Sequence, residues 1–127
     1  MNPPAVDAGI FPRRFPRRGE VYDVDFNPAR GSEQAGRRPA LIVSNDIQNE
    51  HSPVVVVAAI TKTVPKKPYP FIVEIPDGIL PESSRALCNQ LNTIDKERLL
   101  RYRGELHRET FAALDGALCV SLGIRRS

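Results

Sequence analysis

Residues 19–44 read GEVYDVDFNPARGSEQAGRRPALIVS, and this stretch decides the fold. It begins with a β-rich run that Asn27-Pro28 ends, and it returns over residues 40–44 as a second, apolar run. Two glycines punctuate the polar loop between the runs, and glycine readily takes positive φ. The pattern predicts two strands with a polar loop between them, which is how a small scaffold presents a site.

Further elements are predicted on the C-terminal side of this stretch. Residues 53–60, PVVVVAAI, are apolar on both faces, which predicts a central buried strand or one half of a subunit interface. The remaining expected elements are strands over 71–75 and 85–91, a short Asp-capped helix over 95–98, a closing strand near Leu106, and a helix over about 108–122 that Gly123 ends. Residues 48–52 and 61–70 are predicted to be polar connections. Strands first and helix last predict a mainly β fold with α: a small antiparallel barrel closed by a C-terminal helix.

The bulk composition is that of one globular domain. The chain has 127 residues, of which 41% are hydrophobic and 26% are charged, ordinary values for a soluble protein. No apolar run approaches the roughly 20 residues that a membrane helix needs, so no membrane partner is expected.

The N-terminal residues 1–17 are predicted to form a flexible basic arm, because their prolines oppose helix and central strand. The first 18 residues carry four arginines and one aspartate, so they hold the whole formal charge of +3. The arm is either a solubilising segment or one that touches a polyanion. Phe11 and Phe15 could stack on bases or pack on the barrel.

The cysteines and histidines do not form a metal site in the sequence. Cys88 and Cys119 lie in apolar contexts, which predicts buried reduced thiols in a cytoplasmic protein. His51 and His107 are isolated from each other and from the cysteines. We therefore expect no metal and no cofactor.

Several strings carry a resemblance to a known family. They are RGEVYDVDFNP, GSEQAGRRP, LIVSNDIQN, VVAAIT and NQLNTIDKERL, in this order along the chain. The chain resembles the MazF/PemK family of toxin endoribonucleases, from bacterial toxin–antitoxin pairs, over residues 18–124. The toxin domain is accordingly expected to cover residues 18–127, and the arm lies outside the resemblance.

The resemblance implies a fold and an activity. The implied fold is an SH3-like barrel with added helices that works as a homodimer. The implied activity is sequence-selective, metal-independent cleavage of single-stranded RNA through attack by the 2′-hydroxyl. A cognate antitoxin would inhibit the enzyme by laying a C-terminal segment across the RNA groove. In this family the arginine before the proline of GSEQxGxRP is catalytic, here Arg38, and so is the threonine that ends VVAAIT, here Thr61.

The residues themselves suggest further roles. A guanidinium such as Arg38 suits the charged phosphorane, and a hydroxyl such as Thr61 can donate to the same phosphate. Glu33 is the candidate general base, or else it orients an arginine or contacts a base. The candidate RNA-binding residues are Gln34, Arg37, Asn45, Lys62, Asn89 and Gln90. Asn45 could instead be a turn residue, and Lys66 and Lys67 could belong to a solvated loop.

Two other functions compete with RNA cleavage. A toxin of the same fold could poison DNA gyrase by contact, and would then depend on its C-terminal helix. The chain could also be an inert nucleic-acid-binding protein. Arg38 together with Thr61 discriminates, because only the endoribonuclease needs both.

Overall fold

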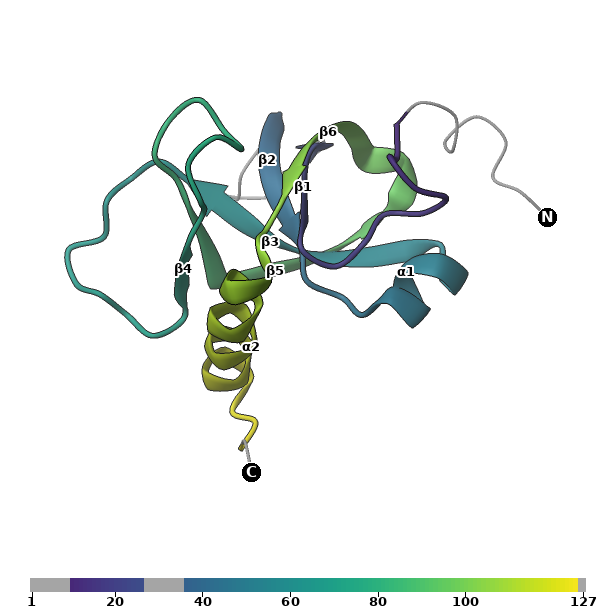
Figure 1. Ribbon diagram of the computed structural model, residues 1–127. Coiled ribbons are helices and arrows are strands. Elements are labelled where there is room, and N and C mark those ends of the chain that lie inside the picture. The colour runs from purple at the N-terminus through teal and green to yellow at the C-terminus, as the bar shows by residue number, and fades with distance from the viewer. Residues whose placement is uncertain (1–9, 27–35, 126–127) are drawn as a thin grey trace.

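The structure is a computed structural model that describes residues 10–26 and 36–125. Its elements, in chain order, are β1 (Glu20–Asp25), β2 (Arg37–Ile42), α1 (Asp46–His51), β3 (Val54–Thr61), β4 (Ile72–Glu74), β5 (Arg85–Asp95), the 3₁₀ turn η1 (Lys96–Arg98), β6 (Leu99–Glu105) and α2 (Arg108–Leu122). Figure 1 shows that the strands form a strongly curved sheet. The helix α2 projects from one side of this sheet, and α1 lies apart from α2.

The strands form one six-stranded sheet in the order β4-β5-β3-β2-β1-β6. Every recorded pair is antiparallel, so the predicted mainly β fold with α is confirmed. The predicted barrel differs in one respect. Within the described ranges, β4 and β6 are the two edges and do not pair with each other, so the sheet curls without closing.

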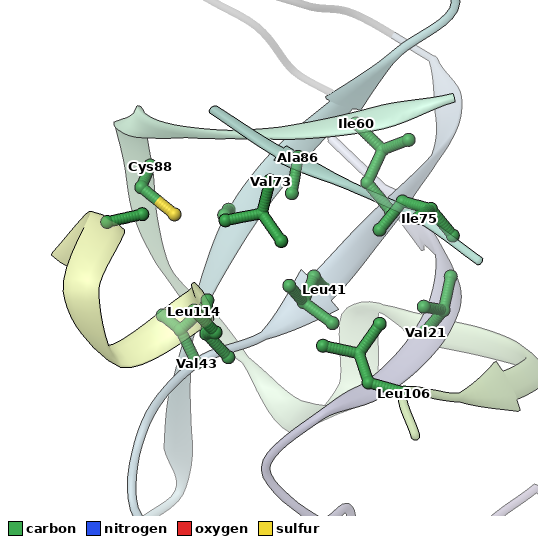
Figure 2. Close-up of a cluster of buried hydrophobic side chains, with 12 residues drawn as sticks. Val21, Leu41, Val43, Ile60, Val73, Ile75, Ala86, Cys88, Leu106 and Leu114 are labelled. Atoms are coloured by element: carbon green, nitrogen blue, oxygen red, sulfur yellow. The ribbon is translucent and has the colours of Figure 1, made fainter. Parts of the chain in front are cut away.

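The sheet buries side chains on both faces, because two separate clusters of apolar residues flank it. Figure 2 shows the first cluster, in which Leu114 of α2 and Val73 of β4 meet Leu41 of β2. The second cluster contains Tyr22 of β1 and Val57 of β3. Neighbouring residues of a strand point to opposite faces, so a strand between two cores must be apolar throughout. This explains the run in β3, which lies inside the sheet as the predicted central strand.

The described end of the N-terminal arm is packed against the sheet, in contrast to the flexible segment expected over residues 1–17. Phe11 is buried, and its ring meets that of Tyr22 edge-on with 5.8 Å between centroids. Phe11 therefore packs on the sheet, one of the two roles predicted for it. We call residues 10–18 the strap. Its prolines prevent regular structure, but they do not prevent packing.

A joint connects the end of the strap to the last helix. Gly19 has φ +93°, and a Cβ built on it would lie 2.3 Å from the Phe111 ring of α2. Beside it, a guanidinium nitrogen of Arg18 lies 2.7 Å from a carboxylate oxygen of Asp115. A side chain at position 19 would collide with Phe111 of α2, so the residue before β1 has to be glycine.

The other predicted elements are recovered to different degrees. The C-terminal helix is confirmed as α2, and Gly123 ends it in the left-handed conformation with φ +70°. The predicted helix over 95–98 is the turn η1, whose Asp95 makes no side-chain capping bond. The helix α1 occupies a predicted connection, and β6 fills a region where only a closing strand near Leu106 was expected. No helix in the described ranges is long and apolar enough to cross a membrane.

Candidate active site

Arg38 and Thr61 occupy equivalent places on neighbouring strands. The ladder between β2 and β3 pairs Ile42 with Val57 and ends at Ala40 with Ala59. Arg38 lies two residues before Ala40 on β2, and Thr61 lies two residues after Ala59 on β3, so both lie beyond the paired segment at the same end of the two strands. Every second residue of a strand faces the same side of the sheet.

The two strands separate at this end. Pro39 has no N–H to donate, and the ladder from β2 to β3 stops beside it. The ladder from β2 to β1 continues through Pro39 to Arg37. Figure 1 shows β2 and β3 diverging from their paired segment toward the beginning of β2 and the tip of β3. Arg38 and Thr61 thus flank the point of divergence.

The two side chains differ in how the fold holds them. Arg38 is exposed and has no carboxylate partner among residues 10–26 and 36–125. Thr61 is half-buried, and its Oγ1 accepts a hydrogen bond of 3.1 Å from the backbone N–H of Thr63. A hydroxyl that accepts in this way keeps its own hydrogen as a donor.

Glu33 and Gln34 lie outside the described residues, so their predicted roles stay predictions. The connection that carries them joins β1 to β2, and the N–H of Phe26 donates to the carbonyl of Gly36 at its base, at 3.0 Å. Arg37 follows Gly36 directly and is exposed. Phe26 and Gly36, the described residues that flank the connection, therefore lie at the same end of the sheet as Arg38.

Lys62 follows Thr61 and lies beside the same end of the sheet. Its Nζ lies 2.9 Å from a carboxylate oxygen of Glu82, and both side chains are largely exposed. Exposed ion pairs contribute little, about 0–1 kcal/mol. A phosphate could therefore replace Glu82 as the partner of Lys62 at small cost.

Asn45 is not brought together with Arg38. It follows the far end of β2, and its Oδ1 accepts a 2.9 Å hydrogen bond from the N–H of Gln48 as the N-cap of α1. It also lines a hollow of about 530 Å³ that Leu118 and Leu122 of α2 share. The helix cap accounts for this asparagine in a way close to the turn role weighed for it.

Asn89 and Gln90 lie on β5, across β3 from Arg38. The register between β3 and β5 shifts after Ala58, and this shift leaves the two amides between the paired positions Leu87 and Leu91. Both residues are exposed. A shift of this kind turns side chains away from the regular alternation, which is how a strand re-aims a polar group.

The titratable groups with perturbed pKa values lie elsewhere. Burial raises the pKa values of Glu20, Tyr22 and Tyr102, which cluster around the strap. Burial also raises the pKa of the Cys88 thiol to about 11, and Cys119 is half-buried and free. No group of three or more His, Cys, Asp or Glu in the described part of the chain could hold a metal ion.

One residue that adjoins Thr61 was not singled out from the sequence. Arg85 begins β5 and pairs with Thr61 in the ladder between β3 and β5. Its side chain is almost completely buried. A lone arginine after two serines gives no signal of this placement.

Comparison with known proteins adds two findings. The model of the PemK-like, MazF-like toxin of type II toxin–antitoxin systems matches residues 17–122. Among solved structures, the chain is similar to an endoribonuclease from a mycobacterial species, with 28% identity and a TM-score of 0.72 over 88% of this chain and 95% of that one.

Two further solved structures agree in fold. An endoribonuclease in complex with its cognate antitoxin, from a mycobacterial species, has 29% identity and a TM-score of 0.73 over 88% of this chain and 99% of that one. MazF from Deinococcus radiodurans has 28% identity and a TM-score of 0.72 over 87% of this chain and 99% of that one.

Proposed function

This chain belongs to the PemK-like, MazF-like toxin family of type II toxin–antitoxin systems, and on that premise we propose that it is an endoribonuclease that cleaves single-stranded RNA at a short sequence motif. The match covers 95% and 99% of two similar solved proteins that are named as endoribonucleases, which supports the same activity here. The proposed reaction needs no metal ion.

The observation that carries this proposal is that Arg38 at the beginning of β2 and Thr61 at the end of β3 lie at the same end of two neighbouring antiparallel strands. A fixed charge and a hydroxyl at one end of a sheet can bind the same phosphodiester. Both are on strands, so the scaffold fixes their separation more firmly than two loops would.

Metal-independent cleavage would use the 2′-hydroxyl of the ribose as the nucleophile. The new bond joins that oxygen to phosphorus, and the bond to the 5′ oxygen breaks. The leaving 5′ oxygen takes up a proton from water, so the products carry a 2′,3′-cyclic phosphate and a 5′-hydroxyl. Arg38 would stabilise the charge on the phosphorane with two parallel N–H donors. Thr61 would donate its remaining hydroxyl hydrogen to the same group, because the N–H of Thr63 already occupies its oxygen as an acceptor.

The base that takes the 2′ proton is proposed to be Glu33, which the chain holds five residues before Arg38. The binding residues proposed with it are Gln34, Arg37, Lys62, Asn89 and Gln90. Arg37 and Lys62 directly adjoin Arg38 and Thr61, which supports a role for them on the flanking phosphates. The register shift in β5 supports base contacts by Asn89 and Gln90.

The proposed partners are a cognate antitoxin and a second copy of the chain, and the proposed location is the cytoplasm. A similar endoribonuclease is found in complex with its cognate antitoxin, which supports the first partner. Val120, Leu122 and Ile124 are apolar and exposed at the end of α2, which supports a partner on that side. Because β3 lies inside the sheet, we propose α2, rather than residues 53–60, as the contact with the second copy.

The test is cleavage of single-stranded RNA by the purified protein in EDTA, with the ends mapped. We expect cuts at one short motif with cyclic phosphate ends. Arg38→Ala and Thr61→Ala should abolish cleavage, and Arg38→Lys should lower the rate about 100-fold, the usual effect of losing one oxyanion donor.

The matched control is Arg101→Ala. Arg101 is an exposed arginine on β6, where it pairs with Asp23 of β1. It should keep the full rate. Cleavage that requires added magnesium would refute the metal-independent chemistry. Intact RNA with arrested gyrase complexes would favour the gyrase poison instead.

A further inference from the structure

Arg85 is the most completely bonded side chain near the proposed site. It is 4% exposed, and each of its five N–H groups has an acceptor. Nε and Nη2 donate to the two carboxylate oxygens of Glu74 on β4, at 3.1 and 3.3 Å. Nη2 also donates to Ser83 Oγ at 3.2 Å. A buried charge so fully satisfied fixes what it touches.

The remaining two bonds reach the segment that follows Thr61. Nη1 of Arg85 donates to the carbonyl oxygens of Lys62 and Thr63, both at 3.0 Å. Otherwise this segment lies outside any strand or helix. Arg85 thus holds the first two residues after β3 against β4 and β5.

The segment that Arg85 holds in turn orients Thr61. The N–H of Thr63 donates to Thr61 Oγ1, at 3.1 Å. The same residue therefore has its carbonyl bound by Arg85 and its amide bound to the threonine hydroxyl. A movement of Thr63 would displace the N–H that donates to Thr61 Oγ1, and would therefore change the orientation of the hydroxyl.

We propose that Arg85 is a positioning residue that, by binding the carbonyl groups of Lys62 and Thr63, fixes the turn that presents the Thr61 hydroxyl as a hydrogen-bond donor to the scissile phosphate. This inference rests on the proposed function. With its oxygen occupied by an amide, the hydroxyl has one hydrogen to give, and its direction is set before RNA binds. Arg85 itself does not touch the substrate.

Lysine could not do the same work. Its ammonium has three donors on a flexible stem, whereas the guanidinium offers five in one plane. The Lys62–Glu82 ion pair also links the segment after β3 to the connection before β5, but this pair is exposed and weak. The positioning therefore depends on Arg85.

The experiment compares Arg85→Lys with Arg103→Lys in the full chain. Arg103 also binds a strand carboxylate, that of Asp23 at 3.0 and 3.1 Å, but touches nothing near Thr61. The substrate is an oligonucleotide that carries the mapped motif, and the binding probe is the same oligonucleotide with 2′-deoxyribose at the cut. We expect Arg85→Lys to lower the single-turnover rate at saturation by about 10- to 100-fold, with affinity for the probe within about twofold.

A second readout follows the proposed contact directly. Hydrogen exchange of the Thr63 amide should quicken in Arg85→Lys and stay unchanged in Arg103→Lys, because only the first releases the turn. If Arg85→Lys does not fold, Glu74→Gln replaces it. This change at an exposed carboxylate loosens the guanidinium and should quicken exchange and slow cleavage together.

Three results would overturn the inference: wild-type cleavage by Arg85→Lys, slowed cleavage with unchanged Thr63 exchange, or an equal loss in Arg103→Lys. Failure of the proposed function would look different. The parent protein would then leave the oligonucleotide intact, while faster Thr63 amide exchange in Arg85→Lys would still report the turn that Arg85 holds.

Discussion

Glu20 is a buried carboxylate with only half of its acceptor capacity used. It is 1% exposed, and its Oε1 accepts hydrogen bonds of 2.7 Å from the N–H of Arg17 and the hydroxyl of Tyr22. Its Oε2 has no hydrogen-bond partner in the described part of the chain. Burial raises the pKa of Glu20, against the lowering effect of the two hydrogen bonds and the Arg13 charge.

This raised pKa makes stability depend on pH. The folded state keeps the Glu20 proton at pH values where the unfolded state has released it, so the free energy of unfolding falls as pH rises above the ordinary glutamate pKa. Glu20→Gln removes that dependence and should gain stability relative to the parent as pH rises above about 4.3, the ordinary glutamate pKa. Urea unfolding across this range measures the difference.

Glu105→Gln is the comparison, because Glu105 is half-exposed, shares the Arg13 contact at 3.8 Å, and its charge helps to raise the pKa of Glu20. It should leave most of the pH dependence in place, because burial is the largest cause of the raised pKa. A difference between Glu20→Gln and the parent that stays constant with pH would show that Glu20 ionises normally.

Arg38 and Thr61 were singled out as site residues by their strings in the sequence, and their catalytic roles stay predictions. The structure places them at the same end of β2 and β3. Arg85 was not singled out, because its role depends on a ladder between segments more than twenty residues apart. No local pattern carries that pairing.

Gly19 is required where the strap meets β1. Gly19→Ala should destabilise the protein by about 1–2 kcal/mol through the left-handed backbone. The clash with the Phe111 ring should add about 1–3 kcal/mol more. Urea unfolding would measure the sum.

Gly123→Ala separates these two effects. Gly123 also has positive φ, but its Cβ would meet nothing within 4 Å. It should show only the backbone cost. Equal losses for the two variants would mean that the helix α2 yields to the new methyl group.

The strap should contribute to stability through one ring. Phe11→Ala should cost about 3 kcal/mol, because it removes a buried aromatic side chain from the contact with Tyr22. Phe15→Ala is the comparison: Phe15 is half-buried and its ring lies 4.3 Å from the Arg17 guanidinium carbon, a contact that contributes about 1 kcal/mol or less. Similar melting temperatures for the two variants would contradict a structural strap.

Elements were predictable where apolar spacing was regular. The strand β3 and the helix α2 followed from such runs, and both are confirmed. The helix α1 was missed because DIQNEH has little apolar periodicity, although Asn45 followed by Gln48 is a recognisable helix start. The strand β6 was missed because tertiary pairing with β1, rather than alternation, sets it.

For the whole molecule, the charge of the strap should matter little to RNA binding. Arg13 lies 3.8 Å from carboxylate oxygens of Glu20 and Glu105, and Arg14 lies 3.7 Å from Glu50. Replacing Arg13 and Arg14 together by alanine should weaken RNA affinity modestly and mainly at low salt. The slope of log affinity against log salt should change by less than about 1.4, the value for two lost phosphate contacts.

Fluorescence anisotropy with the uncleavable oligonucleotide at several salt concentrations would measure this slope. Arg101→Ala serves again as the comparison on the sheet. A larger slope change, or complete loss of cleavage, would show that the strap contacts the substrate.

The joint between Arg18–Gly19 and α2 has a consequence for synthesis on the ribosome. Arg18 binds Asp115, which the ribosome adds 97 residues later, and Phe111 covers Gly19 from the same helix. A nascent chain therefore lacks the helix that covers the start of β1 until residues 111–115 have been synthesised. A premature stop codon before residue 111 would release an unanchored polypeptide, so truncated messages of this gene should yield no poisonous product.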